Sequence, residues 1–140
     1  MLAMSNRSAF PGARSLRDIT AGNALRVINE TRSVELVSRL ALALGPLRRL
    51  RGLLGRAPLA AEEGLLLRPC QAVHTFFMPC PIDVLFLDEG GRVIGLRSEL
   101  RPWRVTPFFG DALATLELAS GRVMATGTSG GDQLRFEVIG

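Results

Sequence analysis

A turn-forming sequence near the middle of the chain separates two short segments that both suit β-strands. Residues 81–87 are almost entirely apolar, the turn is Asp88-Glu89-Gly90-Gly91, and residues 92–99 follow directly. Short runs on either side of such a turn are typical of a β-hairpin. Comparable short runs between glycine, proline or polar residues lie at 24–29, 64–68, 112–118 and 133–139. The chain is therefore expected to form mainly short strands.

Residues 34–44 fit two different structures. Their apolar residues form a stripe at helical spacing, but they also alternate with smaller or polar residues at the spacing of a strand. The alternating pattern separates polar from apolar side chains more cleanly, and it follows a polar turn at 29–33. We therefore favour a strand to about residue 42. Gly45-Pro46 then ends it, and the proline suits the first turn of a short helix at 47–54.

These segments together predict the fold class. One further turn of helix is expected at 120–125, and residues 73–78 and 101–106 are expected to be extended. About seven short strands with one or two short helices indicate a compact, β-rich α+β domain whose sheet is partly closed into a barrel. We expect residues 1–22 to be a flexible extension. A single domain then covers residues 23–140 of the 140-residue chain. This is a usual length for one domain.

Missing residue types exclude several kinds of chemistry. All 17 basic residues are arginine, there is no lysine or tyrosine, and His74 is the single histidine. Without lysine there is no Schiff base and no phosphate-loop lysine, and one histidine excludes a multi-histidine metal site. No cofactor is expected. Because arginine replaces lysine everywhere, the net charge of +4 is not a nucleic-acid signal. No transmembrane segment or signal pattern is visible, so a cytoplasmic location is expected.

Two patterns resemble catalytic or metal motifs. Residues 127–131 match the G-x-S-x-G pattern of a nucleophile elbow, but a strand-like segment follows them and the histidine lies upstream, so we read a turn. Cys70, His74, Cys80 and Asp83 have no common zinc spacing, and no metal is expected. Cys70 and His74 could instead form the nucleophile and base of a small hydrolase or thiol enzyme, which we keep as an alternative to a non-enzymatic role.

An arginine-rich segment offers a third possibility. Arg48, Arg49 and Arg51 lie beside leucines in a short amphipathic segment that could contact an anionic surface. Such segments are more often the solvated face of a helix, with the leucines turned inward.

Several segments, taken in order, resemble one protein family. They are Arg51-Gly52-Leu53-Leu54-Gly55-Arg56, Glu63-Gly64-Leu65-Leu66-Leu67, Val73-His74-Thr75-Phe76-Phe77-Met78, Pro81-Ile82-Asp83-Val84-Leu85-Phe86-Leu87-Asp88, Gly91-Arg92-Val93, Leu116-Glu117-Leu118 and Gly131-Asp132. Over about residues 24–138 the chain resembles the small prokaryotic "uncharacterised ACR" proteins, domain of unknown function 192. It is similar to the branch with His-Thr-Phe where other members carry Phe-Trp-Met, and it departs from the pattern at 120–130. The resemblance implies a compact β-rich fold and no established activity.

The positions that match the family motifs are of two kinds. A structural role is expected for Gly52, Met78, Glu117, Gly131 and Asp132, with the glycines at permissive backbone positions and Asp132 as a turn cap. The candidates for ligand binding are His74, Thr75, Asp83 and Arg56. Asp83 lies within an apolar run, where a buried carboxylate needs a partner such as Arg56 or His74.

The sequence thus favours a soluble, non-enzymatic binding or accessory domain. Its site is expected around His74, Thr75 and Asp83, and its partner is an unknown small molecule or protein.

Overall fold

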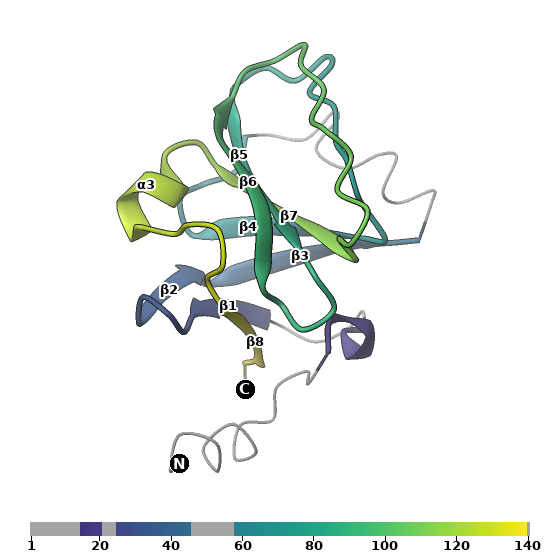
Figure 1. Cartoon of the computed structure of the whole chain (residues 1–140). Coiled ribbons are helices and arrows are strands. Elements are labelled where there is room, and N and C mark those ends of the chain that lie inside the picture. The colour runs from purple at the N-terminus through teal and green to yellow at the C-terminus, as the bar shows by residue number, and fades with distance from the viewer. Residues whose placement is uncertain (1–14, 21–24, 46–57, 140) are drawn as a thin grey trace, which may run out of the picture.

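The computed structural model describes residues 15–20, 25–45 and 58–139, which form eight strands and two short helices (Figure 1). The strands are β1 (Leu25–Asn29), β2 (Val34–Val37), β3 (Arg39–Leu44), β4 (Glu63–Arg68), β5 (Ile82–Leu87), β6 (Val93–Leu100), β7 (Ala114–Ala119) and β8 (Leu134–Val138). The helices are the five-residue α-helix α3 (Arg122–Thr126) and the 3-10 helix η1 (Leu16–Asp18). The β-rich α+β class is confirmed.

The strands form two open sheets. One has the order β2-β1-β8, and the other has the order β3-β4-β7-β5-β6. All pairs are antiparallel except β3 with β4, which run parallel with Ala41 opposite Leu65. The expected barrel is wrong for the described residues, since the strands form two separate open sheets, and only an isolated bridge between Arg92 and Gln133 joins the start of β6 to the start of β8. The two sheets instead bury their apolar faces against each other.

Residues 34–44 are extended, which confirms the strand interpretation over the helical one. They form two strands, however, instead of one. The ladder ends at Val37, where β2 leaves β1, and β3 begins at Arg39 in the other sheet. At the break, the backbone N–H groups of Ser38 and Arg39 both donate to the carbonyl of Glu62. This switch between sheets accounts for eight strands where about seven were expected.

Most other expected elements are confirmed within two residues. β1, β4, β7 and β8 lie where short apolar runs predicted strands, and β5 with β6 forms the expected hairpin. α3 corresponds to the single turn expected at 120–125. The helix expected at 47–54 lies outside the described residues.

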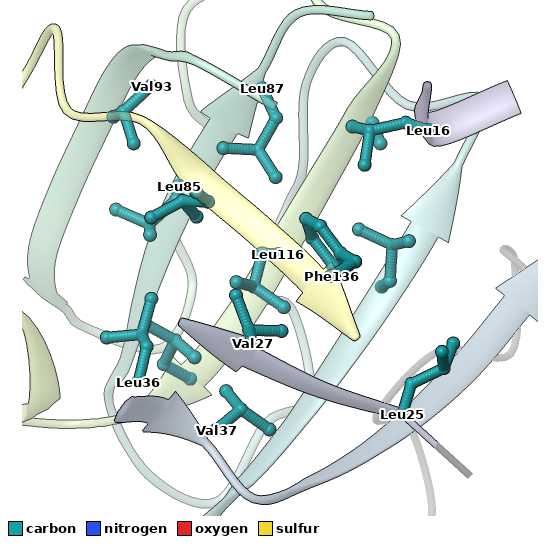
Figure 2. Close-up of a cluster of buried hydrophobic side chains, with 14 of the residues drawn as sticks. Leu16, Leu25, Val27, Leu36, Val37, Leu85, Leu87, Val93, Leu116 and Phe136 are labelled. Carbon is teal, nitrogen blue, oxygen red and sulfur yellow. The ribbon is translucent and has the colours of Figure 1, made fainter. Parts of the chain in front are cut away.

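The main core lies between the two sheets. Figure 2 shows Val27 and Phe136 of the three-stranded sheet among the side chains of Leu85 and Leu116 from the five-stranded sheet. A second apolar cluster covers the opposite face of the five-stranded sheet. It consists of side chains from the alternate positions of the same strands, such as Val84. Because both faces of this sheet are covered, every residue of β5 is buried.

Residues 15–20 also pack on the core. Leu16 and Ile19 belong to the cluster between the sheets, and the Arg68 guanidinium donates to the carbonyl oxygens of both. The packed part of the chain therefore includes residues before 23. In the part of the chain that is described, no helix is both long enough and apolar enough to cross a membrane.

Candidate functional site

Two loops lie together at one end of the molecule, and we call them the paired loops. Residues 69–81 join β4 to β5, residues 101–113 join β6 to β7, and Figure 1 shows them in teal and green at the end opposite β8. Their backbones are joined by hydrogen bonds from the N–H of Thr75 to the carbonyl of Arg104 (2.9 Å) and from the N–H of Trp103 to the carbonyl of Thr75 (3.0 Å). The extended segments expected here thus meet each other, with one isolated β-bridge between His74 and Val105.

Thr75 holds the paired loops together from within. Its side chain is fully buried. Its Oγ1 donates to the carbonyl of Arg101 at 2.6 Å and accepts from the N–H of Arg104 at 2.9 Å. The hydroxyl therefore ties the start of one loop to the middle of the other, on either side of Trp103.

His74, by contrast, lies on the surface. Its Nδ1 accepts a hydrogen bond from the backbone N–H of Phe76 at 3.3 Å, and the two rings lie 4.9 Å apart. This bond uses Nδ1 as the acceptor and leaves Nε2 on the exposed residue for a ligand.

Further aromatic side chains continue from the histidine. The ring of Phe76 stacks on Trp103 at 5.7 Å, and Phe77 meets Trp103 edge-on at 4.7 Å. We call His74, Phe76, Phe77 and Trp103 the aromatic cluster. Phe77 is 75% exposed and Trp103 is 56% exposed, which is unusual for large apolar side chains.

The backbone at the cluster is held in an unfavourable conformation. Phe77 has φ = 65° and Trp103 has φ = 63°, in the left-handed region that bulky residues rarely adopt. A single such residue costs on the order of 1 kcal/mol or more. Two exposed aromatic residues held in this way, in contact with each other, point to a function for these side chains.

The sequence did not reveal this cluster. Phe77 and Trp103 are 26 positions apart along the chain, and neither segment has a periodic pattern. Their contact depends on the pairing of two loops, which no local signal predicts.

Asp83 is buried and hydrogen-bonded, as its position in an apolar run required. Its Oδ1 accepts from the N–H of Glu99, and its Oδ2 accepts from the N–H of Val123, both at 2.7 Å. Glu99 lies at an irregularity in the β5–β6 register. Val123 is in the first turn of α3, whose own N-cap residue, Gly121, has no side chain to provide the cap. Within the described residues these backbone groups, and not His74, are the partners of the carboxylate.

Glu117 is a second buried acid, at the centre of the five-stranded sheet. It lies on β7 between Leu65 and Val84, and its Oε2 has no hydrogen-bond partner among the described residues. Burial raises the pKa of Glu117 to about 7. Because the residue is only 3% exposed, its carboxyl group is positioned to affect stability and not to contact a ligand.

Asp132 anchors the turn before β8. Its carboxylate accepts from the Asn29 side chain, the Arg32 guanidinium and the backbone N–H of Ser129, each at 3.0 Å. Burial alone would raise the pKa of Asp132, but these bonds and the Arg32 charge more than offset it, so the pKa lies below its ordinary value. Gly131 has φ = 90°, as a permissive position requires. Ser129 is therefore part of a turn that joins α3 to β8 and not a nucleophile elbow.

The cysteines do not form a recognisable reactive centre with His74. Cys70 is buried, and its thiol donates to the carbonyl of Ala72 at 3.2 Å, whereas His74 is exposed beside Phe76. Cys80 is half-buried. No group of three or more His, Cys, Asp or Glu side chains gathers as metal ligands among the described residues.

The remaining candidates divide between the core and the part of the chain that is not described. Met78 is buried in the apolar cluster on the outer face of the five-stranded sheet. Five residues lie outside the described residues, namely Gly52, Arg56, Arg48, Arg49 and Arg51.

Comparisons with known proteins agree with this fold. Residues 27–136 match the profile of the uncharacterised ACR family, domain of unknown function 192, and the chain belongs to that family. A UPF0127 protein of Thermococcus sibiricus is 30% identical over 117 residues, which cover 80% of this chain and 75% of that protein. A second one, from Pyrococcus horikoshii, is 32% identical over 82 residues, 56% of this chain and 70% of its own.

A solved structure supports the same architecture. A protein of unknown function from Novosphingobium aromaticivorans superposes with a TM-score of 0.69 at 24% identity, over 87% of this chain and 92% of that one. This likeness shows the fold alone. The names of these relatives state no activity.

Proposed function

We propose that this protein is a non-enzymatic binding domain whose contact surface is the aromatic cluster on the paired loops. The observation that carries the proposal is the exposure of Phe77 and Trp103 on backbone held at positive φ. Large exposed apolar side chains on an otherwise well-packed domain are typical of recognition surfaces. His74 adds a polar ring nitrogen at the edge of this surface.

In this proposal Thr75 and Asp83 position the surface. The buried Thr75 hydroxyl joins the two loops, and the buried Asp83 carboxylate fixes the end of β6 just before the second loop begins. The site expected around His74, Thr75 and Asp83 would thus have one contacting member and two supporting members. Arg56 stays a prediction, as does the cytoplasmic location.

The proposal is tested by separating binding from folding. In Phe77→Asn, asparagine adopts positive φ at a lower cost in free energy than phenylalanine does. This gain offsets the stability lost with the ring contact to Trp103. We expect the free energy of unfolding, from urea denaturation, to stay within about 0.5 kcal/mol of the wild type or to rise. A loss of more than about 1 kcal/mol would assign Phe77 a structural role and contradict the proposal.

His74→Ala provides the matching functional comparison. We expect it to leave the fold and its unfolding midpoint unchanged, because the side chain is exposed and its one described hydrogen bond is to its own loop. Binding of any partner that is retained by the wild type should weaken. A variant that unfolds would show that the histidine supports the fold.

The thiol-enzyme alternative has its own test. A nucleophilic Cys70 activated by His74 would be alkylated by iodoacetamide faster than a model thiol at neutral pH. We expect slow alkylation, because the thiol is buried and donates to a backbone carbonyl. Fast alkylation that is lost in His74→Ala would favour the enzyme.

A further inference from the structure

Two arginines flank the tryptophan of the aromatic cluster. Arg101 and Arg104 are exposed, and neither forms an ion pair with a described residue. The only acid in the paired loops is Asp111, and Glu99 lies on β6 before the second loop. The Arg104 guanidinium donates to the carbonyl of Trp103 at 3.4 Å. The surface around Trp103 therefore combines exposed rings with two arginines that have no acidic partner among the described residues.

The same end of the molecule carries further exposed apolar side chains. Val105 is 64% exposed and Phe108 is 69% exposed, both in the second of the paired loops. The first loop adds Phe77 at its turn. All three side chains are exposed, and the two loops that carry them lie at one end of the molecule (Figure 1).

Exposed rings, apolar side chains and arginines on the same pair of loops match the chemistry of a membrane surface. Tryptophan prefers the boundary between lipid chains and headgroups, and phenylalanine enters the chains below it. Each arginine near an anionic leaflet adds about 1 kcal/mol of attraction, or about fivefold in affinity. A bilayer also accepts protruding side chains without a complementary pocket.

From the proposed binding function, we infer that the occupant of this surface is an anionic phospholipid bilayer. Phe77 and Phe108 enter the outermost part of the lipid chains, Trp103 lies at the headgroup boundary, and Arg101 and Arg104 contact lipid phosphates. The contact is peripheral and reversible, and it weakens with salt because the charge attraction is screened.

The chain offers its own probe for the test. Trp103 is the single tryptophan and there is no tyrosine, so intrinsic emission reports on the paired loops alone. Full-length protein is titrated with vesicles of phosphatidylcholine mixed with phosphatidylglycerol, and with pure phosphatidylcholine vesicles. We expect a blue shift of Trp103 emission with the anionic vesicles, quenching by lipids brominated near the headgroup end of the chain, and loss of both in high salt.

Variants separate the two kinds of contact. Arg101→Gln with Arg104→Gln should weaken binding by about 25-fold, from about fivefold for each charge. Phe77→Ser should weaken it about tenfold through lost apolar burial. The matched control is Met124→Ser on α3, an equally exposed apolar residue (77%) on a different element, and it should bind as the wild type does.

Three outcomes would overturn the inference. They are no spectral response to anionic vesicles, equal binding to neutral vesicles with no effect of the arginine variants, and self-association in sedimentation that Phe77→Ser abolishes while vesicles have no effect. The last would assign the cluster to a second copy of the chain. If Phe77→Asn keeps its stability but vesicles do not bind, the binding function stands with another partner. If Phe77→Asn is destabilised, the proposed function itself fails.

Discussion

Asp83 shows how one buried side chain can join separate parts of this molecule. Its two oxygens satisfy the N–H of Glu99 at the irregular end of β6 and the N–H of Val123 at the start of α3. Without the carboxylate the buried N–H of Val123 and the partly buried N–H of Glu99 would both lose their acceptor. This charged acceptor in an apolar strand therefore satisfies the backbone at the end of β6 and at the start of α3.

We predict that Asp83→Ala lowers the free energy of unfolding by about 2–4 kcal/mol, since one buried and one partly buried backbone donor lose a charged acceptor. Urea denaturation followed by circular dichroism measures the loss. Asp111→Ala, at an exposed acid, is the control and should change it by less than about 0.5 kcal/mol. Equal effects of the two substitutions would show that the Asp83 hydrogen bonds contribute little.

Glu117 should make stability depend on pH in the opposite sense from an ordinary carboxylate. Its pKa rises from 4.5 to about 7 in the folded state, so the folded protein favours the neutral acid. The free energy of unfolding is therefore unaffected by this burial below pH 4.5, where the acid is neutral in both states. It falls by about 3 kcal/mol as pH rises through about 7, because the folded state must then bury a charged carboxylate. We expect Glu117→Gln to remove this loss, so that the variant gains stability over the wild type as pH increases.

Denaturation series at several pH values measure this difference. Glu99→Gln, at an exposed acid on β6, is the matched control and should follow the wild type at every pH. A constant difference between wild type and Glu117→Gln across this range would mean that Glu117 titrates normally.

At the scale of elements, the turn from α3 to β8 depends on backbone conformation as much as on side chains. Asn29, Arg32 and Ser129 converge on Asp132 and hold the turn against the β1–β2 connection. Gly131 adopts φ = 90° within it, and a Cβ there would meet no atom within 4 Å. The glycine is thus required by its conformation and not by lack of space.

We predict that Gly131→Ala costs about 1 kcal/mol of stability through the left-handed backbone alone. Gly130→Ala is a close control, because its Cβ would also meet nothing within 4 Å and its φ is not positive. Thermal unfolding of both variants should show a lower midpoint for Gly131→Ala only. A matching decrease in Gly130→Ala would show that the turn tolerates no side chain at either position.

Much of this element-level structure was predictable because its causes are local. The turn at 88–91, the alternation in 34–44 and the glycine before Asp132 each act within a few residues, and the strands and turns they predicted are present. The break at Ser38 was not predictable. Alternation continues through it, and only the competing partners β1 and β4 separate β2 from β3.

At the scale of the whole molecule, the two sheets share one core. Leu116 of the central strand β7 is fully buried and lies in the cluster with Val27 and Phe136 of the other sheet (Figure 2). Each sheet alone would leave an apolar face in water, so neither is expected to persist without the other.

Leu116→Ala should therefore destabilise both sheets together, by about 2–5 kcal/mol for a cavity at a fully buried leucine. Unfolding followed by far-ultraviolet circular dichroism and by Trp103 fluorescence should give the same lowered midpoint. Met124→Ala, on the exposed side of α3, should leave it unchanged. A shift in one signal only would mean that the sheets unfold independently.

The sequence by itself determined the class of fold, the order of most strands, the hairpin of β5 and β6 and the resemblance to the family, because strand periodicity and turn chemistry are properties of neighbouring residues. It also placed Asp83 within an apolar strand, where a buried carboxylate needs hydrogen-bond partners. Only the tertiary structure decided that the sheets stack without closing, that Asp83 caps α3, that Glu117 is buried without a hydrogen-bond partner for its Oε2 among the described residues, and that Phe77 meets Trp103. Each of these depends on which distant surfaces come into contact, and that choice is made by the free energy of packing the whole chain.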